Sequence, residues 1–390
     1  MISVDEALAR VFDLAHPMPT EHVPLAEAAG RVLAQPVQAT RDQPPFAASA
    51  MDGYAISTAT AAAGDSFDVI GEAAAGHGYA GPVGAGETVR IFTGAPLPEG
   101  AKRVIIQEDV TREADRITLR DNLGGGTHIR PAGADFATGA TIDAPHLLRP
   151  ADIALLAAMN IATVPVARRP IVALIATGDE LVMPGETPSA DQIIASNTFG
   201  LKAMIDAAGA RARVLPIARD TAASLHTAFA LAEGADLIVT IGGASVGDHD
   251  LVAPVAADLG MKRAFYKIAM RPGKPLMAGR MGESAMIGLP GNPVSSMVCA
   301  QLFILPLLRA MLGLGCHATP RQQRPLDKDI GPNGPREHYM RARLSATGIA
   351  PFDRQDSALL SVLTAADALL IRPVNDGPRT TGDVVDYIPI

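Results

Sequence analysis

A short apolar stretch that ends in two glycines places the tightest limit on how this chain can fold. Residues 237–241 (LIVTI) are followed directly by Gly242 and Gly243. A continuous apolar run bounded by glycines is typical of a strand covered on both faces, as in parallel sheets. In open α/β sheets, ligands bind beyond the carboxyl ends of such strands. The stretch therefore predicts an α/β domain with a binding site at this strand end, with a bare tight turn as the alternative interpretation.

The loop after this strand has the chemistry of an anion site. It carries Ser245, Gly247, Asp248 and Asp250. Glycines let backbone N–H groups approach an anion closely, and the serine hydroxyl adds a donor. The candidate substrate-binding residues of this stretch are Gly242, Gly243, Ser245 and Gly247.

Length and charge limit the class of protein. A chain of 390 residues predicts two to four domains. The net charge of −8 argues against a broad surface for nucleic-acid phosphates, and 4% aromatic residues without Trp leave few platforms for base stacking. We therefore expect no nucleic-acid partner, and any anion site must be a local basic pocket.

The remaining compositional signals indicate a cytoplasmic protein. Two cysteines, Cys299 and Cys316, give neither a disulfide framework nor a metal cluster. The N-terminus lacks a basic segment followed by an apolar core, as a signal peptide requires. The most apolar run, 298–308, is interrupted by Gln301 and is shorter than a membrane span. We expect no membrane partner.

The first 167 residues predict a small β domain inserted into another module. Residues 3–15, 25–33 and 151–159 have helical patterns, and the first begins with a capping box of Ser3 and Glu6. Short β-like runs lie between them, at 67–71, 88–92, 103–106 and 116–119. We predict an elongated N-terminal module of helix and strand from residues 1–39 and 127–167, with a β domain at 40–126.

The second half predicts two further domains. From 168 to 318, strands alternate with helices, as in a doubly wound sheet, and Pro306 should kink the last helix. The expected strands are 171–176, 213–217, 237–241, 265–269, 275–277 and 285–289, and the expected helices are 196–209, 221–233, 254–259 and one from about 293. From 319 to 390, runs at 336–344, 359–363, 368–372 and 384–388 predict a small C-terminal β-barrel.

Charged residues gather in the loops that leave the strands of the α/β domain. The open-sheet rule places these loops on one rim. Their carboxylates suit a divalent cation such as Mg²⁺, and their cations suit a phosphate. These residues are Asp179, Glu180, Asp220, Asp248 and Asp250 together with Lys267, Arg271 and Lys274.

Each piece also has a structural interpretation. A strand-end carboxylate such as Asp179 or Asp220 is often the N-cap of the next helix. A solvated strand position is the alternative interpretation of Lys267, and a helix start is the alternative for Pro290 and Pro293. Asp52-Gly53 by itself predicts a hairpin turn. The nine histidines show no paired spacing, so we expect no zinc site.

Seven stretches, taken together, resemble the molybdopterin molybdenumtransferase family, which includes the C-terminal part of gephyrin. They come in the family's order and cover nearly the whole chain. They are SAMDGYAI (49–56), IFTGAPLPEGA (91–101), IRPAGADF (129–136), TGDEL (177–181), GGASVGDHD (242–250), KIAMRPGKP (267–275) and GLPGNPVSS (288–296).

The resemblance implies a fold and a reaction. It implies an elongated four-domain subunit with a central molybdopterin-binding domain, in a homodimer whose subunits share the active cleft. It implies Mg²⁺-dependent insertion of molybdate into adenylylated molybdopterin, with release of AMP. Transient contacts with the adenylyltransferase and with chaperones of molybdoenzymes are implied as well.

The resemblance also assigns roles to residues. It implies catalytic roles for Asp52, Thr93, Glu180, Asp220, Asp250, Lys267, Arg271 and Lys274, with Glu180, Asp220 and Asp250 as candidate ligands of Mg²⁺. It implies substrate contacts for Arg130, Asp135, Pro275, Pro290, Asn292, Ser295, Arg341 and Ser357. The chain departs from the family pattern at Arg271, where Lys is usual, at Ala195, where Asp is usual, and at Lys102, where Asp is frequent.

Two other functions compete with this one. An adenylyltransferase that uses ATP shares the GGxSxG type of domain, but the additional N-terminal and C-terminal domains argue against it. A non-enzymatic scaffold is the second, since gephyrin also anchors receptors, but the sequence shows no long disordered linker. Release of AMP that depends on molybdate distinguishes the transferase from both.

Overall fold

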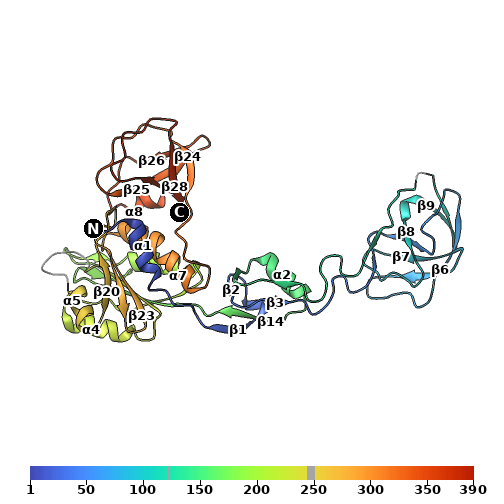
Figure 1. The fold of residues 1–390 in the computed structure, drawn as a ribbon, viewed down its shortest axis with the longest axis horizontal. Helices are drawn as coiled ribbons and strands as arrows, with labels where there is room; N and C mark the ends of the chain where they lie inside the picture. The colour runs from blue at the N-terminus through green and yellow to red at the C-terminus, as the bar shows by residue number, and fades with distance from the viewer. Residues whose placement is uncertain (122, 244–250) are drawn as a thin grey trace.

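The protein is elongated, with its sheets strung along its length (Figure 1). The structure, a computed structural model, describes residues 1–121, 123–243 and 251–390. The α/β sheet and the C-terminal sheet lie together at one end, a small sheet lies in the middle, and a six-stranded β domain lies at the far end. The predicted multidomain architecture of α/β plus β is confirmed.

The central sheet contains the strand that the sequence singled out. Its order is β18 (Arg211–Val214), β15 (Ile171–Ala176), β19 (Leu237–Ile241), β23 (Ser284–Leu289), β22 (Met277–Met281) and β20 (Lys262–Tyr266). The first four strands are parallel, and β22 runs against both of its neighbours. The chain goes from β15 to β18 on one side and then to β19 on the other, so the strand order reverses at β15. This reversal is the topological switch point where α/β sheets bind ligands.

Helices cover both faces of this sheet, as predicted for a doubly wound fold. Val172 and Leu174 of β15 pack into one core, and Ala173 and Ile175 pack into another, because successive strand residues point to opposite faces. The first core is covered by α1 (Val4–Phe12), α3 (Asn197–Ala207), α6 (Pro293–Cys299) and α7 (Leu305–Met311), and the second by α4 (Ala222–Leu231) and α5 (Val252–Asp258).

The first helix confirms half of the predicted capping box. Ser3 Oγ accepts a hydrogen bond of 3.0 Å from the Glu6 backbone N–H. The Glu6 carboxylate pairs with Arg10 at 2.6 Å, one turn along. The buried residues of α1 pack with α7 and β20 on the α/β sheet, although residues 1–39 are assigned above to the N-terminal module. The division of the chain into four domains stays a prediction.

The long apolar helix predicted from residue 293 is irregular where Pro306 affects it. A π-helical turn, Ala300–Ile304, joins α6 to α7. Pro306 has no N–H to complete the regular ladder at this turn. The combined helix, Pro293–Met311, has the length and apolar character of a membrane span, but 78% of its most apolar window is buried in the molecule. It is the core helix of the α/β domain.

The N-terminal module is a small antiparallel sheet with one helix, α2 (Pro150–Ala158). Its strand order is β1 (Thr20–Pro24), β14 (Thr163–Ala167), β2 (Val32–Leu33) and β13 (His146–Leu147), and a second ladder joins β3 (Val37–Gln38) to β12 (Thr141–Ile142). The predicted helix at 25–33 is wrong. A single 3₁₀ turn, Leu25–Glu27, is followed by Gly30 at a φ of +73°, and this left-handed residue leads the chain into β2.

The inserted β domain contains the predicted strands. Its order is β8 (Arg103–Ile106), β5 (Gly53–Ile56), β7 (Glu87–Ile91), β6 (Ser66–Ala73), β10 (Arg116–Leu119) and β9 (Val110–Glu113), with a 3₁₀ turn at Gln107–Asp109. A separate pair, β4 (Ala48–Ser49) and β11 (Ile129–Arg130), lies where the chain enters and leaves the domain. Gly53 begins β5, and a Cβ there would lie 2.0 Å from the Ile105 carbonyl oxygen. The predicted hairpin turn at Asp52-Gly53 is therefore wrong: the glycine serves a close strand contact.

The C-terminal sheet closes into the predicted barrel. Its order is β21 (Met270–Arg271), β25 (Glu337–Leu344), β27 (Ala368–Arg372), β28 (Val384–Pro389) and β24 (Gln322–Pro325), and β26 (Ile349–Pro351) pairs with β25. A bridge from Leu326 to Ile349 joins the end of β24 to β26. The predicted strand at 359–363 is wrong: Leu360–Thr364 forms a helix, α8, which contacts α6, and Leu363 packs against the α/β core.

Candidate active site

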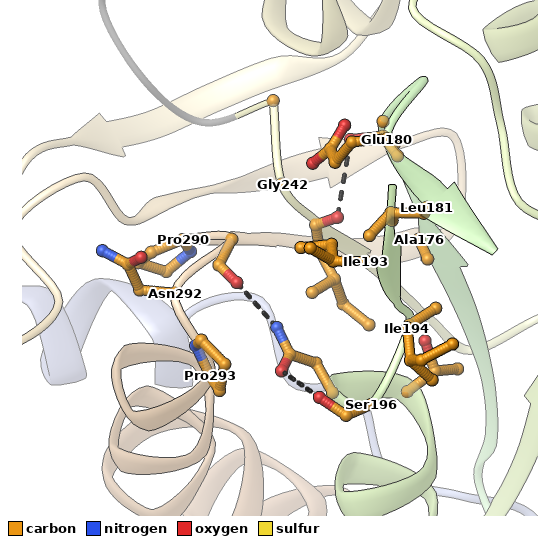
Figure 2. Close-up of a pocket in the computed structure, with 18 of the residues that line it drawn as sticks. Ala176, Glu180, Leu181, Ile193, Ile194, Ser196, Gly242, Pro290, Asn292 and Pro293 are labelled. Carbon is orange, nitrogen blue, oxygen red and sulfur yellow. Dashed lines mark hydrogen bonds between the residues drawn. The ribbon is translucent and has the colours of Figure 1, made fainter. Parts of the chain in front are cut away.

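A cavity of about 690 Å³ opens at the switch point of the α/β sheet. The carboxyl ends of β15 and β19 form its floor, through Thr177 and Gly178 from one strand and Gly242 and Gly243 from the other. The remaining lining comes from the loops after β15, β18 and β23, from the start of α3, from Pro275 of the RPGKP loop and from Ala358 of the barrel. The predicted location of the site is therefore where the structure has its cavity (Figure 2).

The glycines of the floor have steric reasons for being glycine. Gly242 and Gly243 have φ values of +96° and +60°, which favour a residue without a Cβ. A Cβ on Gly242 would lie 2.8 Å from the Thr177 carbonyl oxygen, and one on Gly243 would lie 2.3 Å from Val252 Cγ2. Close packing of three chain segments thus brings the backbone of both glycines to this part of the cavity surface.

Two carboxylates, Glu180 and Asp220, line the cavity from neighbouring loops. Arg219 ties these loops together, since its Nη1 lies within 3.0–3.3 Å of the carbonyl oxygens of residues 178, 179 and 181. Asp179 Oδ1 accepts a hydrogen bond from the Asp220 backbone N–H at 3.2 Å. The N-cap interpretation is wrong for both aspartates, because a two-residue strand, β16 (Leu181–Val182), follows Asp179, and Thr221 caps α4.

The opposite side of the cavity is formed by the loop that leads into α6. Pro290 and Asn292 line it, and Pro275 of the RPGKP loop lies beside them. Asn197 at the start of α3 joins this side, because its Nδ2 donates a 2.7 Å hydrogen bond to the Gly291 carbonyl. In Figure 2, Asn292 and Pro293 lie on one side and Leu181 and Ile194 on the other.

Sequence reasoning missed the apolar part of the lining. Ile193 and Ile194 form β17, which pairs with β16, and both side chains line the cavity. Ile193 is 58% exposed, which is unusual for a residue so apolar. A two-residue strand gives no periodic signal. The signal that could have revealed it is the pair of isoleucines in an otherwise polar loop. Ala195, the departure from the family pattern, also lines the cavity and is buried.

The predicted cations lie beside the cavity, outside its lining. Lys267 Nζ is 5.2 Å from the centroid of the Tyr266 ring. Lys274 is exposed in the same loop as Pro275. Arg271 is exposed at the end of β21, in register with His338 of β25. The RPGKP loop therefore joins the α/β sheet to the C-terminal barrel and carries its charges between the two.

Arg341 of β25 is a fully buried arginine with incomplete hydrogen bonding in the described chain. It is 0% exposed, and its Nη2 donates a 3.0 Å hydrogen bond to the Asp356 carbonyl. Its Nε and Nη1 are buried without a hydrogen-bond partner among the residues that the structure describes. Burial and the nearby Arg271 lower the pKa of Arg341 to about 10, so the guanidinium remains a cation at neutral pH. Two unsatisfied donors on a buried cation indicate a place for an anion.

The other C-terminal candidate lies between Arg341 and the cavity. The Ser357 carbonyl accepts a 3.0 Å hydrogen bond from the Val294 N–H in the first turn of α6, and the next residue, Ala358, lines the cavity. Ser295 is buried in the same turn of α6 and is not part of the cavity lining in the described chain. The barrel loop 352–358 thus connects Arg341 to the α/β site.

The candidates from the N-terminal half lie far from this cavity. Asp52 Oδ1 accepts hydrogen bonds from the Thr93 N–H at 2.7 Å and from its hydroxyl at 2.8 Å, and these bonds lower the pKa of Asp52. This pair belongs to the β domain at the other end of the molecule (Figure 1). Arg130 in β11 and Asp135 beyond it are exposed where that domain joins the N-terminal module. Within one chain, these four residues are not brought to the cavity.

A part of the predicted site is not described. Ser245, Gly247, Asp248 and Asp250 lie in the stretch 244–250, outside the described residues. Over residues 1–121, 123–243 and 251–390, no group of three or more His, Cys, Asp or Glu is placed to hold a metal ion. Glu180 and Asp220 are nevertheless hard oxygen donors in one cavity, and Mg²⁺ is commonly held by one or two carboxylates with waters and a substrate phosphate. The residues present fit that ion.

Known proteins match this chain over nearly its whole length. Family profiles described as MoeA N-terminal region (domain I and II), probable molybdopterin binding domain and MoeA C-terminal region (domain IV) match residues 2–160, 173–310 and 323–390. A molybdopterin molybdenumtransferase from a Nostoc species is 34% identical over 92% of this chain and 86% of that protein. The chain belongs to the molybdopterin molybdenumtransferase family.

Further members of the family support the assignment. The molybdopterin molybdenumtransferase of Haemophilus influenzae is 35% identical over 80% of this chain and 78% of its own length. Two crystal structures of the molybdopterin biosynthesis MoeA protein from Pyrococcus horikoshii superpose on the whole chain, with TM-scores of 0.85 and 0.84, sequence identities of 29% and 27%, and coverage of 99% and 100% of those chains. The family resemblance of the seven motifs and the multidomain fold are therefore confirmed.

Proposed function

We propose that this transferase inserts molybdate into adenylylated molybdopterin and releases AMP. Two features carry the proposal. One is a cavity with two carboxylates at the switch point of the sheet, and the other is a buried arginine that has two donors without a partner among the described residues. A large anionic substrate suits the first feature and a small dianion suits the second. The loop that contains Ser357 and Ala358 joins them.

Molybdate is assigned to the barrel side of the site. Arg341 offers Nε and Nη1, and Arg271 and Lys274 add positive charge from the neighbouring RPGKP loop. Charge-assisted hydrogen bonds of this kind are about twice as strong as neutral ones. Ser295 and Ser357 are the hydroxyls that we assign to the same anion.

The adenylylated pterin is assigned to the cavity. Gly242 and Gly243 let its phosphates approach the backbone closely, and Pro275, Pro290 and Asn292 form the facing side. Ser245 and Gly247, which lie outside the described residues, are proposed to contact the same substrate. Lys267 is proposed to compensate the negative charge that develops when the phosphoanhydride is cleaved.

Glu180 and Asp220, with Asp250, are the residues we propose to hold Mg²⁺. The bound ion would neutralise charge on the phosphoanhydride. The chain's own contribution is to hold two anionic substrates together and to compensate their charge, because no covalent intermediate with the protein is needed. An oxygen of molybdate or of water attacks the phosphoanhydride, and AMP leaves. The dithiolene sulfurs of the pterin then replace oxygen ligands of molybdenum, which depart as water.

We propose that a second copy of the chain completes the cleft. Asp52 and Thr93, together with Arg130 and Asp135, lie too far along the elongated chain to reach its own cavity. In a homodimer with antiparallel subunits, the β domain of one chain would lie at the cavity of the other. Partner enzymes that deliver or receive the pterin are proposed to dock transiently at this cleft.

One assay tests the proposal against its rivals. The purified protein is incubated with adenylylated molybdopterin, molybdate and Mg²⁺, and release of AMP is followed. Release that depends on molybdate is the expected result. Consumption of ATP with free molybdopterin would instead identify an adenylyltransferase. If neither reaction occurred, a non-enzymatic scaffold would be supported.

A further inference from the structure

The side-chain amide of Gln355 holds the backbone of Arg341 as a neighbouring strand would. Gln355 Oε1 accepts a 3.0 Å hydrogen bond from the Arg341 N–H, and its Nε2 donates a 2.9 Å hydrogen bond to the Arg341 carbonyl. The same Nε2 donates to the Phe352 carbonyl at 2.8 Å. One amide group thus satisfies both backbone groups of the strand residue that carries the candidate anion contact.

This arrangement continues a ladder that would otherwise end. The strand β26 pairs with β25 as far as Pro351 opposite Ala342, and the Phe352 N–H adds one more bond to the Arg341 carbonyl. Beyond that point the chain turns away from β25. Without Gln355, the Arg341 N–H would have no partner on this side of the strand. The amide of Gln355 takes the place of the missing peptide group and keeps this end of β25 regular.

The guanidinium completes a closed loop with the same segment. Arg341 Nη2 donates to the Asp356 carbonyl at 3.0 Å, so Arg341 holds residues 355 and 356 through its backbone and its side chain at once. This fixes one edge of the guanidinium and leaves Nε and Nη1 open within the described structure. The next carbonyl, that of Ser357, contacts the first turn of α6.

We propose that Gln355 is a positioning residue for oxyanion binding, because it sets the direction in which Arg341 presents its open donors. The inference rests on the proposed function, since it takes Arg341 as the contact for molybdate. An arginine whose backbone is held on both sides loses little freedom when it binds an anion. Without the amide, the loop 352–358 and the guanidinium would have to be ordered by the anion itself.

The test is direct binding of molybdate to the full-length protein, measured by calorimetry without the pterin. The variant is Gln355→Met, which keeps the length of the side chain and removes its hydrogen bonds. We expect the dissociation constant for molybdate to rise about tenfold, as expected for the loss of a few hydrogen bonds. In the AMP-release assay, the KM for molybdate should rise by a similar factor, while kcat at saturating molybdate changes less than about twofold.

A matched control separates positioning from simple stability. Asn333 is another amide of the barrel that holds a loop, because its Nδ2 donates to the carbonyls of residues 336, 372 and 373. Asn333→Ala should lower the midpoint of urea unfolding and leave molybdate affinity unchanged. If wild-type protein binds molybdate and Gln355→Met binds it equally well, the role of Gln355 is refuted and the proposed function stands. If wild-type protein does not bind molybdate, the anion site itself is refuted, together with this inference.

Discussion

Two arginines of the C-terminal barrel are equally buried and are bonded in opposite ways. Arg372, 2% exposed, donates from Nε to Asp376 at 2.6 Å and from its two terminal nitrogens to the carbonyls of Gly331 and Gly377. Arg341, 0% exposed, has one bond to a carbonyl and two open donors in the described chain. Each nitrogen of the Arg372 guanidinium thus has a hydrogen-bond partner, whereas among the described residues only one nitrogen of Arg341 has one.

The difference shows how a structural charge is distinguished from a charge kept for a ligand. Burial of a cation without its hydrogen bonds costs several kcal/mol of folding free energy. A folded protein therefore provides partners for such a group unless a ligand provides them. Arg372 has its carboxylate in the chain. Arg341 has Arg271 as a near neighbour, which repels it more strongly than the Asp356 carboxylate attracts it. An incoming dianion would relieve both cations at once.

The largest expected effect is on stability, from Arg372→Met. The substitution leaves the nearly buried Asp376 carboxylate with Arg379 as its remaining arginine partner, and it removes the guanidinium that bonds the carbonyls of Gly331 and Gly377. We expect the free energy of unfolding to fall by about 3–5 kcal/mol, measured by urea denaturation. Arg343→Met, at an exposed position of the same strand as Arg341, is the control. A loss below about 1 kcal/mol would mean that Arg372 is no more structural than a surface residue.

Arg341→Met should affect turnover strongly and stability little, the reverse of Arg372→Met. Removing a buried, partly satisfied cation relieves desolvation, so we expect stability to be unchanged or higher. Turnover at fixed molybdate should fall by about 10²–10³, as found when a donor to a reacting anion is removed. AMP release and urea unfolding, measured on the same preparation, check both parts. A variant that unfolds more easily while retaining turnover would show that Arg341, like Arg372, has a structural role and does not bind the substrate.

The same comparison applies to a pair of aspartates, Asp52 and Asp42. Asp42 Oδ1 accepts hydrogen bonds of 2.7 and 2.8 Å from the N–H and hydroxyl of Thr138, as Asp52 does from Thr93. From these hydrogen bonds alone, both aspartates would be assigned the structural role of holding two loops together. We expect Asp52→Ala to lower turnover about a hundredfold with the fold intact, and Asp42→Ala to leave turnover unchanged. Equal turnover in the two variants would remove Asp52 from the mechanism.

The sequence predicted the fold well where an apolar run is bounded by clear breakers or where a motif is specific to the family. The strand Leu237–Ile241 has the predicted bounds, and the seven motifs identified the family. The predictions failed for short elements: residues 25–33 and 359–363 are apolar runs whose structure depends on Gly30 and on packing against α6. It could not be predicted that two donors of Arg341 lack partners in the described chain, because this depends on how residues 352–358 fold back onto β25. Sequence spacing likewise cannot show that Asp42 and Asp52 share one geometry.

Lys274→Ala tests whether a charge outside the cavity lining still contributes. Lys274 is exposed, and its neighbour Pro275 lines the cavity. Loss of one charge-assisted hydrogen bond should reduce turnover about 10–100-fold without affecting unfolding. Lys262→Ala, at the opposite end of the α/β sheet, is the matched control, because Lys262 begins β20 and is exposed. Normal turnover of the Lys274 variant would restrict the basic pocket to the barrel arginines.

The smallest effect is the pH dependence of the Arg372 pair. Burial raises the pKa of Asp376, but hydrogen bonds from Arg379 and Arg372 outweigh it and hold the pKa below its ordinary value of 3.8. A carboxylate with a lowered pKa in the folded state stabilises the fold above its unfolded pKa, and this contribution is lost as pH falls through the folded pKa. The stability gap between wild type and Arg372→Met should therefore be constant from pH 5 to 7 and should shrink below about pH 4. Urea unfolding at several pH values measures the gap. Arg341→Met should show a smaller acid-dependent gap, because the guanidinium of Arg341 is hydrogen-bonded to the neutral Asp356 carbonyl and interacts with the Asp356 carboxylate only through space. A gap for Arg372→Met that persists at pH 3 would mean that its effect comes from lost packing and not from the ion pair.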